Sequence, residues 1–180
     1  KTITTGYYKK PEATAAAIDR DGWFHTGDAG YLKDSHLYLT ERIKDLFKTS
    51  NGKYISPQAL ETKLAIDRYI DQIAVIADER KFVSALIVPV YGFVKDYAKE
   101  KGIAYSNMDE LLQHPKIQAL FRARIDTLQQ QFAHYEQVKR FTLLTEPFSM
   151  ERGELTNTLK LKRSVVAKNY KGLIDKMYEE

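Results

Sequence analysis

The sequence predicts a small α+β domain, a short sheet with packed helices, preceded by a short β-rich segment. Two observations predict this fold class. About the first forty residues are rich in glycine, aspartate and aromatic side chains, as turns and short strands are. After them, β-branched apolar runs alternate with longer stretches of helical periodicity. We therefore predict two parts, a β-rich segment over residues 1–43 and a domain over residues 44–180.

The first part should contain turns and short strands. Tyr31–Leu39 places a polar turn between two apolar segments, which predicts a hairpin. Further on, Ile43–Phe47 and Tyr54–Ile55 flank a turn that contains Asn51-Gly52, a dipeptide that favours hairpins. A second, shorter strand pair is therefore predicted there.

A helix is predicted directly after this strand pair. Ser56 is a good N-cap and Pro57 suits the first helical position. Glu61 then places a negative charge early in the helix, which we expect to reach about Ile66.

The remaining elements follow from apolar periodicity. Ile70–Ala77 and Phe82–Val90 are apolar runs on either side of a charged turn, which predicts an antiparallel pair of buried strands. The stretch Val94–His134 has apolar residues mostly three or four apart and predicts two or three helices, interrupted near a glycine and a proline. Val138–Thr145 predicts a further strand, and Arg163–Tyr178 a closing amphipathic helix.

Composition is that of an ordinary globular protein. Of 180 residues, 43% are hydrophobic and 29% are charged, which provides enough apolar material for a core. The chain has no cysteine, so it has no disulfide, no thiolate nucleophile and no sulfur-ligated metal. The histidines are scattered, so we expect no metal site in this chain. No apolar run is long enough to span a membrane. Because the chain does not begin with methionine, we expect it to be part of a longer protein.

Several short motifs could bind a ligand, but each one has an ordinary interpretation. Asp28 follows Thr26-Gly27 and could accept hydrogen bonds from vicinal hydroxyls, although turns use these residues constantly. Arg42 lies in a charge run, where a surface ion pair with Glu41 or Asp45 is the alternative. Asn-Gly makes turns everywhere, and a lysine in the basic run near residue 160 could simply be solvated.

Together, however, these motifs resemble the C-terminal motifs of the adenylate-forming superfamily, which comprises acyl-CoA synthetases, luciferases and nonribosomal adenylation domains. Long-chain fatty acyl-CoA synthetases look most similar, because their last motif has the form found at Glu154–Arg163, with Leu159 where most other branches have glycine. Their lid domain also carries more helix. The resemblance rests on these segments, in order: Gly6–Tyr8, Pro11–Thr14, Asp21–Asp28, Glu41–Asp45, Asn51–Pro57 and Leu155–Lys160.

The resemblance implies roles for residues of the first part. Asp28 matches the carboxylate that binds the ribose hydroxyls of the nucleotide. Arg42 matches the arginine that contacts ribose or phosphate. Lys44 matches the hinge about which the lid domain rotates between two half-reactions.

The resemblance also implies roles for residues of the lid. Asn51, Gly52 and Lys53 match the loop that forms part of the CoA pantetheine passage. Lys160 matches the catalytic lysine that neutralises charge while the carboxylate attacks the α-phosphate of ATP.

The resemblance therefore implies the C-terminal fragment of an ATP-dependent long-chain fatty acid CoA ligase. The ligands of the complete enzyme would be a fatty acid, ATP, CoA and Mg²⁺, with the metal ligands outside this chain. An absent N-terminal domain would hold most of the ATP and the acid, so we expect the fragment alone to be inactive. The implied location is cytoplasmic, with peripheral association with a membrane compatible with a lipid substrate.

Two alternatives remain open at this stage. One is an adenylating enzyme that transfers its acyl group to a carrier protein or another acceptor. The other is a module that binds nucleic acid or membrane, because the net charge is +4. The lysines of the last helix fall on several faces and no aromatic platform accompanies them, so we expect no nucleic-acid partner.

Overall fold

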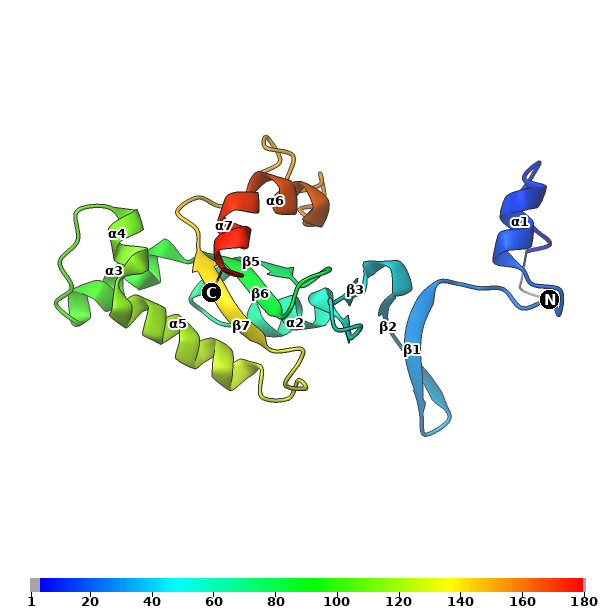
Figure 1. Cartoon of the computed structure of the whole chain (residues 1–180), viewed down its shortest axis with the longest axis horizontal. Coiled ribbons are helices and arrows are strands. Elements are labelled where there is room, and N and C mark those ends of the chain that lie inside the picture. The colour runs from blue at the N-terminus through cyan, green and yellow to red at the C-terminus, as the bar shows by residue number, and fades with distance from the viewer. Residues whose placement is uncertain (1–3, 180) are drawn as a thin grey trace. The chain divides into compact units, whose positions relative to one another are not determined.

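The computed structural model describes residues 4–179, and it divides into two compact units, Lys1–Leu46 and Phe47–Glu180. Figure 1 shows a helix and a hairpin in the first unit, and a sheet with helices in the second. The predicted α+β class is confirmed.

The described part of the N-terminal unit, residues 4–46, contains a hairpin and a helix. β1 (Asp28–Lys33) pairs antiparallel with β2 (His36–Arg42), so the first hairpin is confirmed. A helix that was not predicted, α1, spans Pro11–Ala17, where turns and short strands were expected. Proline at the first position and an alanine-rich sequence favour a helix there more strongly than the surrounding turn residues oppose it.

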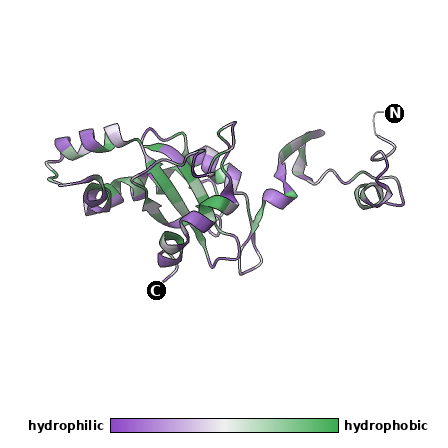
Figure 2. Ribbon diagram, turned by 90° about the horizontal axis from the view of Figure 1, so that it is seen from above, coloured by the Kyte–Doolittle hydropathy of each residue, from purple (hydrophilic) through white to green (hydrophobic). Residues whose placement is uncertain are grey.

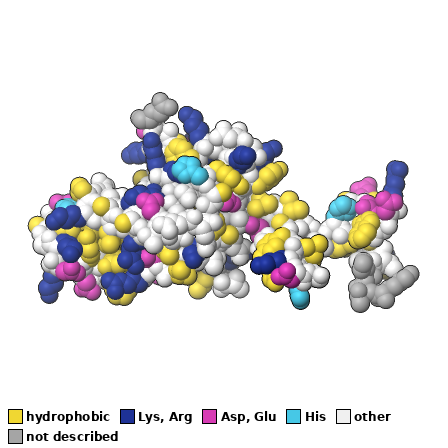
Figure 3. Space-filling model, turned by 90° about the horizontal axis from the view of Figure 1, so that it is seen from below, with side chains coloured by type: hydrophobic (Ala, Val, Ile, Leu, Met, Phe, Trp, Pro, Cys, Tyr) yellow, Lys and Arg dark blue, Asp and Glu magenta, His cyan; other side chains and the backbone are white. Residues whose placement is uncertain are grey.

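Residues 4–46 of the N-terminal unit form no core, because none of them is buried. Leu32, Leu37 and Leu39 of the hairpin are between 65% and 77% exposed, and the rings of Tyr31 and Tyr38 stack at 5.1 Å on its surface. Figure 3 shows hydrophobic side chains gathered on this hairpin. Packing within the unit therefore leaves most of its apolar surface in solvent.

The predicted strand over Ile43–Phe47 was wrong in most of its length. A single 3-10 turn, η1, spans Ile43–Asp45, and β3 comprises only Phe47–Lys48. β3 pairs antiparallel with β4 (Tyr54–Ile55), which confirms the second strand pair around the Asn-Gly turn.

The main sheet has three strands in the order β5-β6-β7. β5 (Ile70–Ile76) and β6 (Val83–Pro89) are antiparallel, as predicted. β7 (Val138–Leu143) lies parallel to β6, because the chain returns to the same end of the sheet through helices. These are α3 (Tyr91–Glu100), α4 (Met108–Gln113) and α5 (Pro115–Leu128), which confirms the helical stretch and its two interruptions.

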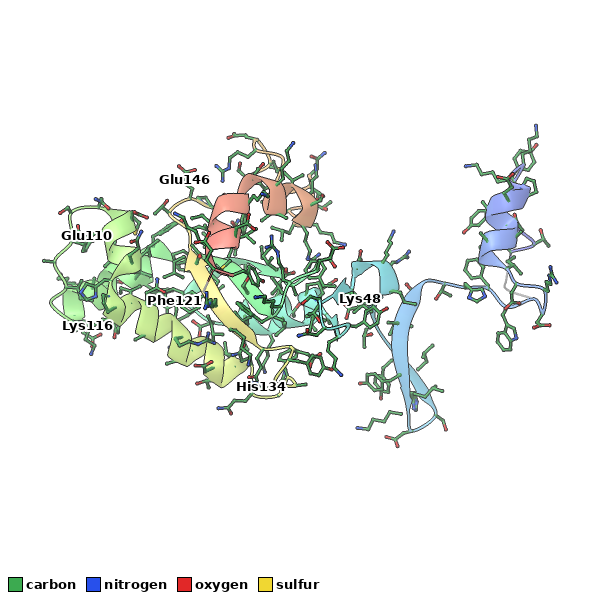
Figure 4. The ribbon with its side chains drawn as sticks, viewed as in Figure 1. Lys48, Glu110, Lys116, Phe121, His134 and Glu146 are labelled. Carbon is green, nitrogen blue, oxygen red and sulfur yellow. The ribbon has the colours of Figure 1, made fainter. Side chains whose placement is uncertain are left out.

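Both faces of this sheet are buried, which explains the nearly continuous apolar runs of its strands. Ile73 and Val75 belong to one core cluster, with residues of α2 (Pro57–Leu64), α3, α4 and α5. Ala74 and Ile76 belong to the other, with residues of α6 (Arg163–Asn169) and α7 (Lys171–Lys176). In Figure 2 the strands form the most hydrophobic part of the ribbon. Phe121 of α5, labelled in Figure 4, is the largest fully buried side chain of this core among the described residues.

The helix after β4 begins as predicted. α2 spans Pro57–Leu64, and the Ser56 hydroxyl accepts a hydrogen bond from the Ala59 N–H at 3.2 Å. Glu61, expected early in the helix, lies beyond its first turn. Its carboxylate is largely buried and accepts a hydrogen bond from the Val75 N–H of β5 instead.

The closing helix is broken in two. α6 spans Arg163–Asn169 and α7 spans Lys171–Lys176, where one helix was predicted. Tyr170 lies between them at φ −104° and ψ 19°, and its ring packs edge-on against Phe148. The break therefore coincides with an aromatic contact that no local periodicity encodes. Among residues 4–179, no helix is long and apolar enough to cross a membrane.

Candidate functional site

Asp28 and Arg42 lie opposite each other at the open end of the β1–β2 hairpin. They are register partners, and the Arg42 Nε lies 3.3 Å from the Asp28 Oδ1. Arg42 is thus paired with Asp28, and the ion pairs considered with Glu41 or Asp45 are not the ones formed. The side chains are 58% and 29% exposed, and such exposed pairs stabilise a fold by only about 0–1 kcal/mol. The pair is open to a ligand, with a carboxylate acceptor beside guanidinium donors.

The chain leaves this pair through a short and weakly held segment. Lys44 is exposed and lies in the middle of the 3-10 turn η1. The backbone bond that closes the turn joins the Leu46 N–H to the Ile43 carbonyl oxygen at 3.2 Å and does not use the Lys44 N–H. The boundary between the two compact units follows at Leu46. A change in the backbone dihedrals of Lys44 therefore disturbs little else that is bonded.

The loop between β3 and β4 carries Asn51, Gly52 and Lys53, and Thr49 holds it in shape. Thr49 is 6% exposed, and both its N–H and its hydroxyl donate to the Lys53 carbonyl oxygen, at 2.9 and 3.2 Å. Its hydroxyl oxygen in turn accepts from the Lys53 N–H at 3.1 Å. These bonds present the tip of the loop as a fixed turn.

Two further contacts tie the loop to its surroundings. The Ser50 N–H donates to the Arg80 carbonyl oxygen in the β5–β6 turn at 3.0 Å. The Lys53 Nζ lies 5.6 Å from the centre of the Tyr135 ring, which precedes β7. In Figure 4, Lys48 marks the strand that leads into this loop.

Gly52 is required for its backbone conformation and not for space. Its φ is +74°, and a Cβ built on it would meet no atom within 4 Å. We expect Gly52→Ala to lower the free energy of unfolding by about 1–2 kcal/mol, the usual cost of a left-handed residue. Urea unfolding of the chain measures this change.

Gly92 provides the matched control. It lies in α3, has no positive φ, and its Cβ would also meet no atom within 4 Å. Gly92→Ala should be neutral or stabilising by up to about 1 kcal/mol. Equal effects of the two substitutions would contradict the conformational explanation.

Lys160 lies near the tip of a short hairpin between β7 and α6. The arms of the hairpin meet in an isolated bridge between Leu155 and Leu161. The Lys160 carbonyl oxygen accepts from the Thr156 N–H at 2.8 Å, and the Lys160 N–H donates to the Thr156 hydroxyl oxygen at 3.0 Å. The Lys160 side chain is exposed. The backbone at this lysine is thus fixed, while its ammonium group is free to reach a ligand.

A buried carboxylate lies at the base of this hairpin. Glu154 is 0% exposed and accepts hydrogen bonds from the Ser149 N–H at 3.0 Å, the Arg152 Nε at 3.1 Å and the Asn169 Nδ2 at 3.1 Å. Burial by itself would raise the pKa of Glu154, but the bonds from Arg152, Asn169 and Ser149 together outweigh it and lower the pKa below its ordinary value. Glu154 is therefore held as an anion.

This lowered pKa predicts a loss of stability in acid. Because the folded-state pKa of Glu154 is depressed, its contribution is fully present above the unfolded pKa of about 4.3 and is lost as the pH falls through the folded pKa. The difference in unfolding free energy between the wild type and Glu154→Gln should therefore shrink as the pH falls from about 7 to below about 4. Urea unfolding at several pH values measures it.

The wild type and Glu154→Gln must be compared because the pKa of Glu61 is shifted in the opposite direction. Burial raises the pKa of Glu61 in spite of its ion pair with Arg163, so its contribution is present below the unfolded pKa and is lost as the pH rises through the folded pKa. Subtracting the two unfolding curves removes this contribution. A difference that stays constant down to acid pH would contradict the depressed pKa of Glu154.

Apart from Lys44, the predicted site residues therefore fall into three groups. Asp28 and Arg42 touch within the N-terminal unit. The loop of Asn51, Gly52 and Lys53 and the hairpin of Lys160 are separate parts of the C-terminal unit.

Sequence reasoning missed the residues that hold these segments. The role of Thr49 could have been predicted, because it flanks the Asn-Gly turn and a threonine hydroxyl often bonds nearby backbone. The role of Glu154 could not have been predicted, because nothing in its neighbourhood in the sequence indicates burial. Among residues 4–179, no group of three or more His, Asp or Glu side chains is placed to hold a metal ion.

Comparison with known proteins agrees with these motifs. A family model described as the AMP-binding enzyme C-terminal domain matches residues 44–180. Long chain acyl-CoA synthetase 7, a peroxisomal protein of Arabidopsis thaliana, is 36% identical over 182 residues, which are 99% of this chain and 26% of the relative. Long-chain-fatty-acid–CoA ligase 5 of Rattus norvegicus is 36% identical over 184 residues, which are 98% of this chain and 26% of the relative. The chain thus spans about a quarter of the length of these relatives.

Solved structures give a consistent result. The adenylation domain of a carboxylate reductase from Mycobacterium chelonae has a TM-score of 0.74 and 27% identity, with 98% of this chain and 26% of that chain covered. The A domain of a carboxylic acid reductase from Segniliparus rugosus, solved in complex with AMP and a co-purified carboxylic acid, has a TM-score of 0.74 and 25% identity, with 99% and 27% covered. On these matches, the chain belongs to the family of AMP-binding enzyme C-terminal domains, within the superfamily of the long-chain acyl-CoA synthetases.

Proposed function

We propose that this chain is the C-terminal part of an ATP-dependent long-chain fatty acid CoA ligase. The observation that carries the proposal is the pairing of Asp28 with Arg42 at 3.3 Å, which places an acceptor and donors together on an accessible strand end. The names of the most similar curated relatives support the substrate class, since they are long-chain acyl-CoA synthetases.

The proposed reaction has two steps. In the first, a carboxylate oxygen of the fatty acid attacks the α-phosphorus of ATP, and pyrophosphate leaves. In the second, the CoA thiol attacks the carbonyl carbon of the acyl-adenylate, the thiol proton is lost to solvent or a base, and AMP leaves. Mg²⁺ supplies charge neutralisation on the phosphates when bound, with its ligands outside this chain.

The residues of this chain have distinct tasks in the proposal. The Asp28 carboxylate accepts hydrogen bonds from ribose hydroxyls, and Arg42 donates to ribose or phosphate. Lys160 places its ammonium group beside the charge that develops at the α-phosphate. Lys44 is the hinge, and the loop of Asn51, Gly52 and Lys53 guides the pantetheine arm during the second step.

The exposed hairpin fits a chain that works with another domain. Residues 4–46 contain no buried side chain, and the apolar surface of β1 and β2 would gain stability by packing against an N-terminal domain. Such a domain would hold the acid and most of the ATP, so the 180-residue chain alone is expected to be inactive. We place the complete enzyme in the cytoplasm, with peripheral contact to a membrane that supplies its substrate.

The test is the reaction of the complete protein with fatty acids of several lengths, ATP and Mg²⁺, with and without CoA. Release of pyrophosphate with the acid alone, followed by AMP and acyl-CoA release on addition of CoA, is the expected result. Adenylate formation without CoA-dependent thioester release would favour transfer to a carrier protein or another acceptor. Absence of adenylate formation with every acid would reject both.

A further inference from the structure

The hairpin that carries Lys160 is attached to the domain by its base and not by its tip. Asn157, Thr158, Leu159 and Lys160 are exposed, whereas Glu154 is buried. Leu159 has φ +59°, a conformation that leucine rarely adopts, and its N–H donates to the Thr156 carbonyl oxygen at 2.8 Å. A turn with a residue in this conformation persists only when the surrounding bonds hold it.

Glu154 joins the two chain segments that flank the hairpin. Its carboxylate bonds Ser149 and Arg152 before the hairpin and Asn169 of α6 after it. Its backbone closes the base, because its N–H donates to the Ser149 carbonyl oxygen at 2.9 Å and its carbonyl oxygen accepts from the Lys162 N–H at 2.7 Å. A buried carboxylate is costly unless it is bonded and paired, so these donors and Glu154 hold one another in place. In Figure 1 the base lies in the orange segment beside α6.

Arg152 extends this network toward the surface. Besides Glu154, it contacts Glu146 at 3.3 Å and donates to the Pro147 carbonyl oxygen. Glu146, labelled in Figure 4, belongs to the segment that leaves β7. A single guanidinium therefore links the end of the sheet to the base of the hairpin.

A second ion pair holds the other arm. Arg163, the first residue of α6, pairs with Glu61 of α2, and Glu61 also accepts from the Val75 N–H of β5 at 3.0 Å. The hairpin is thus fixed on one side to the loop after β7 and on the other to α2 and the sheet. Lys160 is the residue that this arrangement presents.

We propose that Glu154 is a positioning residue that holds the Lys160 hairpin in its reactive conformation for adenylate formation. The inference rests on the role proposed above for Lys160. Glu154 does not touch the substrate in this account; it acts through the backbone of the hairpin. A lysine on a fixed turn has less freedom to lose when it meets the α-phosphate, and small displacements of such a group reduce rates strongly.

The experiment compares Glu154→Gln with the wild type in the complete protein, in each half-reaction. Glutamine has the same shape but no charge, and its NH₂ group faces donors. We expect kcat of adenylate formation to fall about tenfold or more, because misplacement by about 1 Å can reduce rates up to about a hundredfold. KM for ATP and acid should be unchanged, and so should thioester formation from supplied acyl-adenylate. Arg152→Gln removes a partner of Glu154 at a more exposed position, so it should lower kcat of adenylate formation less. It keeps the test possible if Glu154→Gln does not fold.

Asp67→Asn is the matched control. Asp67 is also a buried carboxylate, 8% exposed, with an arginine partner, Arg124, at 2.6 Å, but it lies between α2 and β5, away from the hairpin. Loss of the Asp67 charge should leave the ratio of the two half-reaction rates as it is in the wild type. Equal slowing of both half-reactions by Glu154→Gln, or the same pattern in Asp67→Asn, would show general destabilisation and overturn the proposal.

Amide hydrogen exchange tests the positioning itself, without any activity. In the wild type, the N–H groups of Thr156, Leu159, Lys160 and Lys162 are bonded within the hairpin. They should exchange about tenfold faster or more in Glu154→Gln, as their opening becomes easier, and at the wild-type rate in Asp67→Asn. Unchanged exchange would overturn the proposal. If Lys160→Ala left adenylate formation intact, the proposed function of Lys160 would fail, while the exchange result would still decide what holds the hairpin.

Discussion

Lys160→Ala in the complete protein should reduce adenylate formation by about a hundredfold to a thousandfold, the usual effect of removing one preorganised group that stabilises transition-state charge. Thioester formation from supplied acyl-adenylate should stay close to the wild-type rate, because the proposed rotation of the lid carries Lys160 away before that step. The exposed ammonium group and the bonded backbone of Lys160 suit a residue that reaches into a site from a fixed turn. Separate assays of pyrophosphate release and acyl-CoA release measure the two steps.

Lys162→Ala is the control for this experiment. Lys162 is also exposed and follows on the same hairpin, and it uses its backbone N–H in the bond to Glu154. Its substitution removes an equal charge from the same surface and should leave both steps unchanged. Equal loss of both steps in Lys160→Ala would assign the lysine to folding or to general substrate binding.

Lys44→Pro should separate the two steps in the opposite direction. Proline fixes φ near −65°, which suits the 3-10 turn observed at Ile43–Asp45, and it removes no N–H that the turn uses. The fold should therefore tolerate the change, whereas rotation about this residue becomes restricted. We expect thioester formation to fall about tenfold, equivalent to about 1.4 kcal/mol in the barrier, with a smaller effect on adenylate formation.

Lys44→Ala distinguishes the backbone from the side chain. It removes the exposed ammonium group but leaves φ and ψ free, so both steps should proceed as in the wild type. Thioester formation that is unimpaired in Lys44→Pro, or equally impaired in Lys44→Ala, would argue against a backbone hinge at this position. Single-turnover measurements of each step give the comparison.

Local patterns predicted much of this fold because the information lay within a few residues. The apolar runs of β5 and β6, the interrupted helices between them and β7, and the Ser56-Pro57 start of α2 are all read from short windows. The hairpin Tyr31–Leu39 was equally visible. The same kind of local pattern failed at Pro11–Ala17, because the turn residues around this short helix favoured a prediction of turns and strands.

The candidate site residues stay a prediction. Motifs that resemble a known superfamily point to Asp28, Arg42 and Lys160, because residues proposed to bind ligands are recognised by type and spacing. The partners that hold them were not recognised. Glu61 was interpreted as a charge that favours the start of a helix, yet it pairs with Arg163, far along the chain.

The sequence by itself determined the fold class, most of its helices and strands, and the family. Only the tertiary structure decided that β7 lies parallel to β6, that α6 and α7 are separate, and that Glu154 is buried under three donors. The physical reason is that periodicity and capping are set by neighbouring residues. The cost of burying a charge, and the bonds that offset it, depend on groups brought together from distant segments.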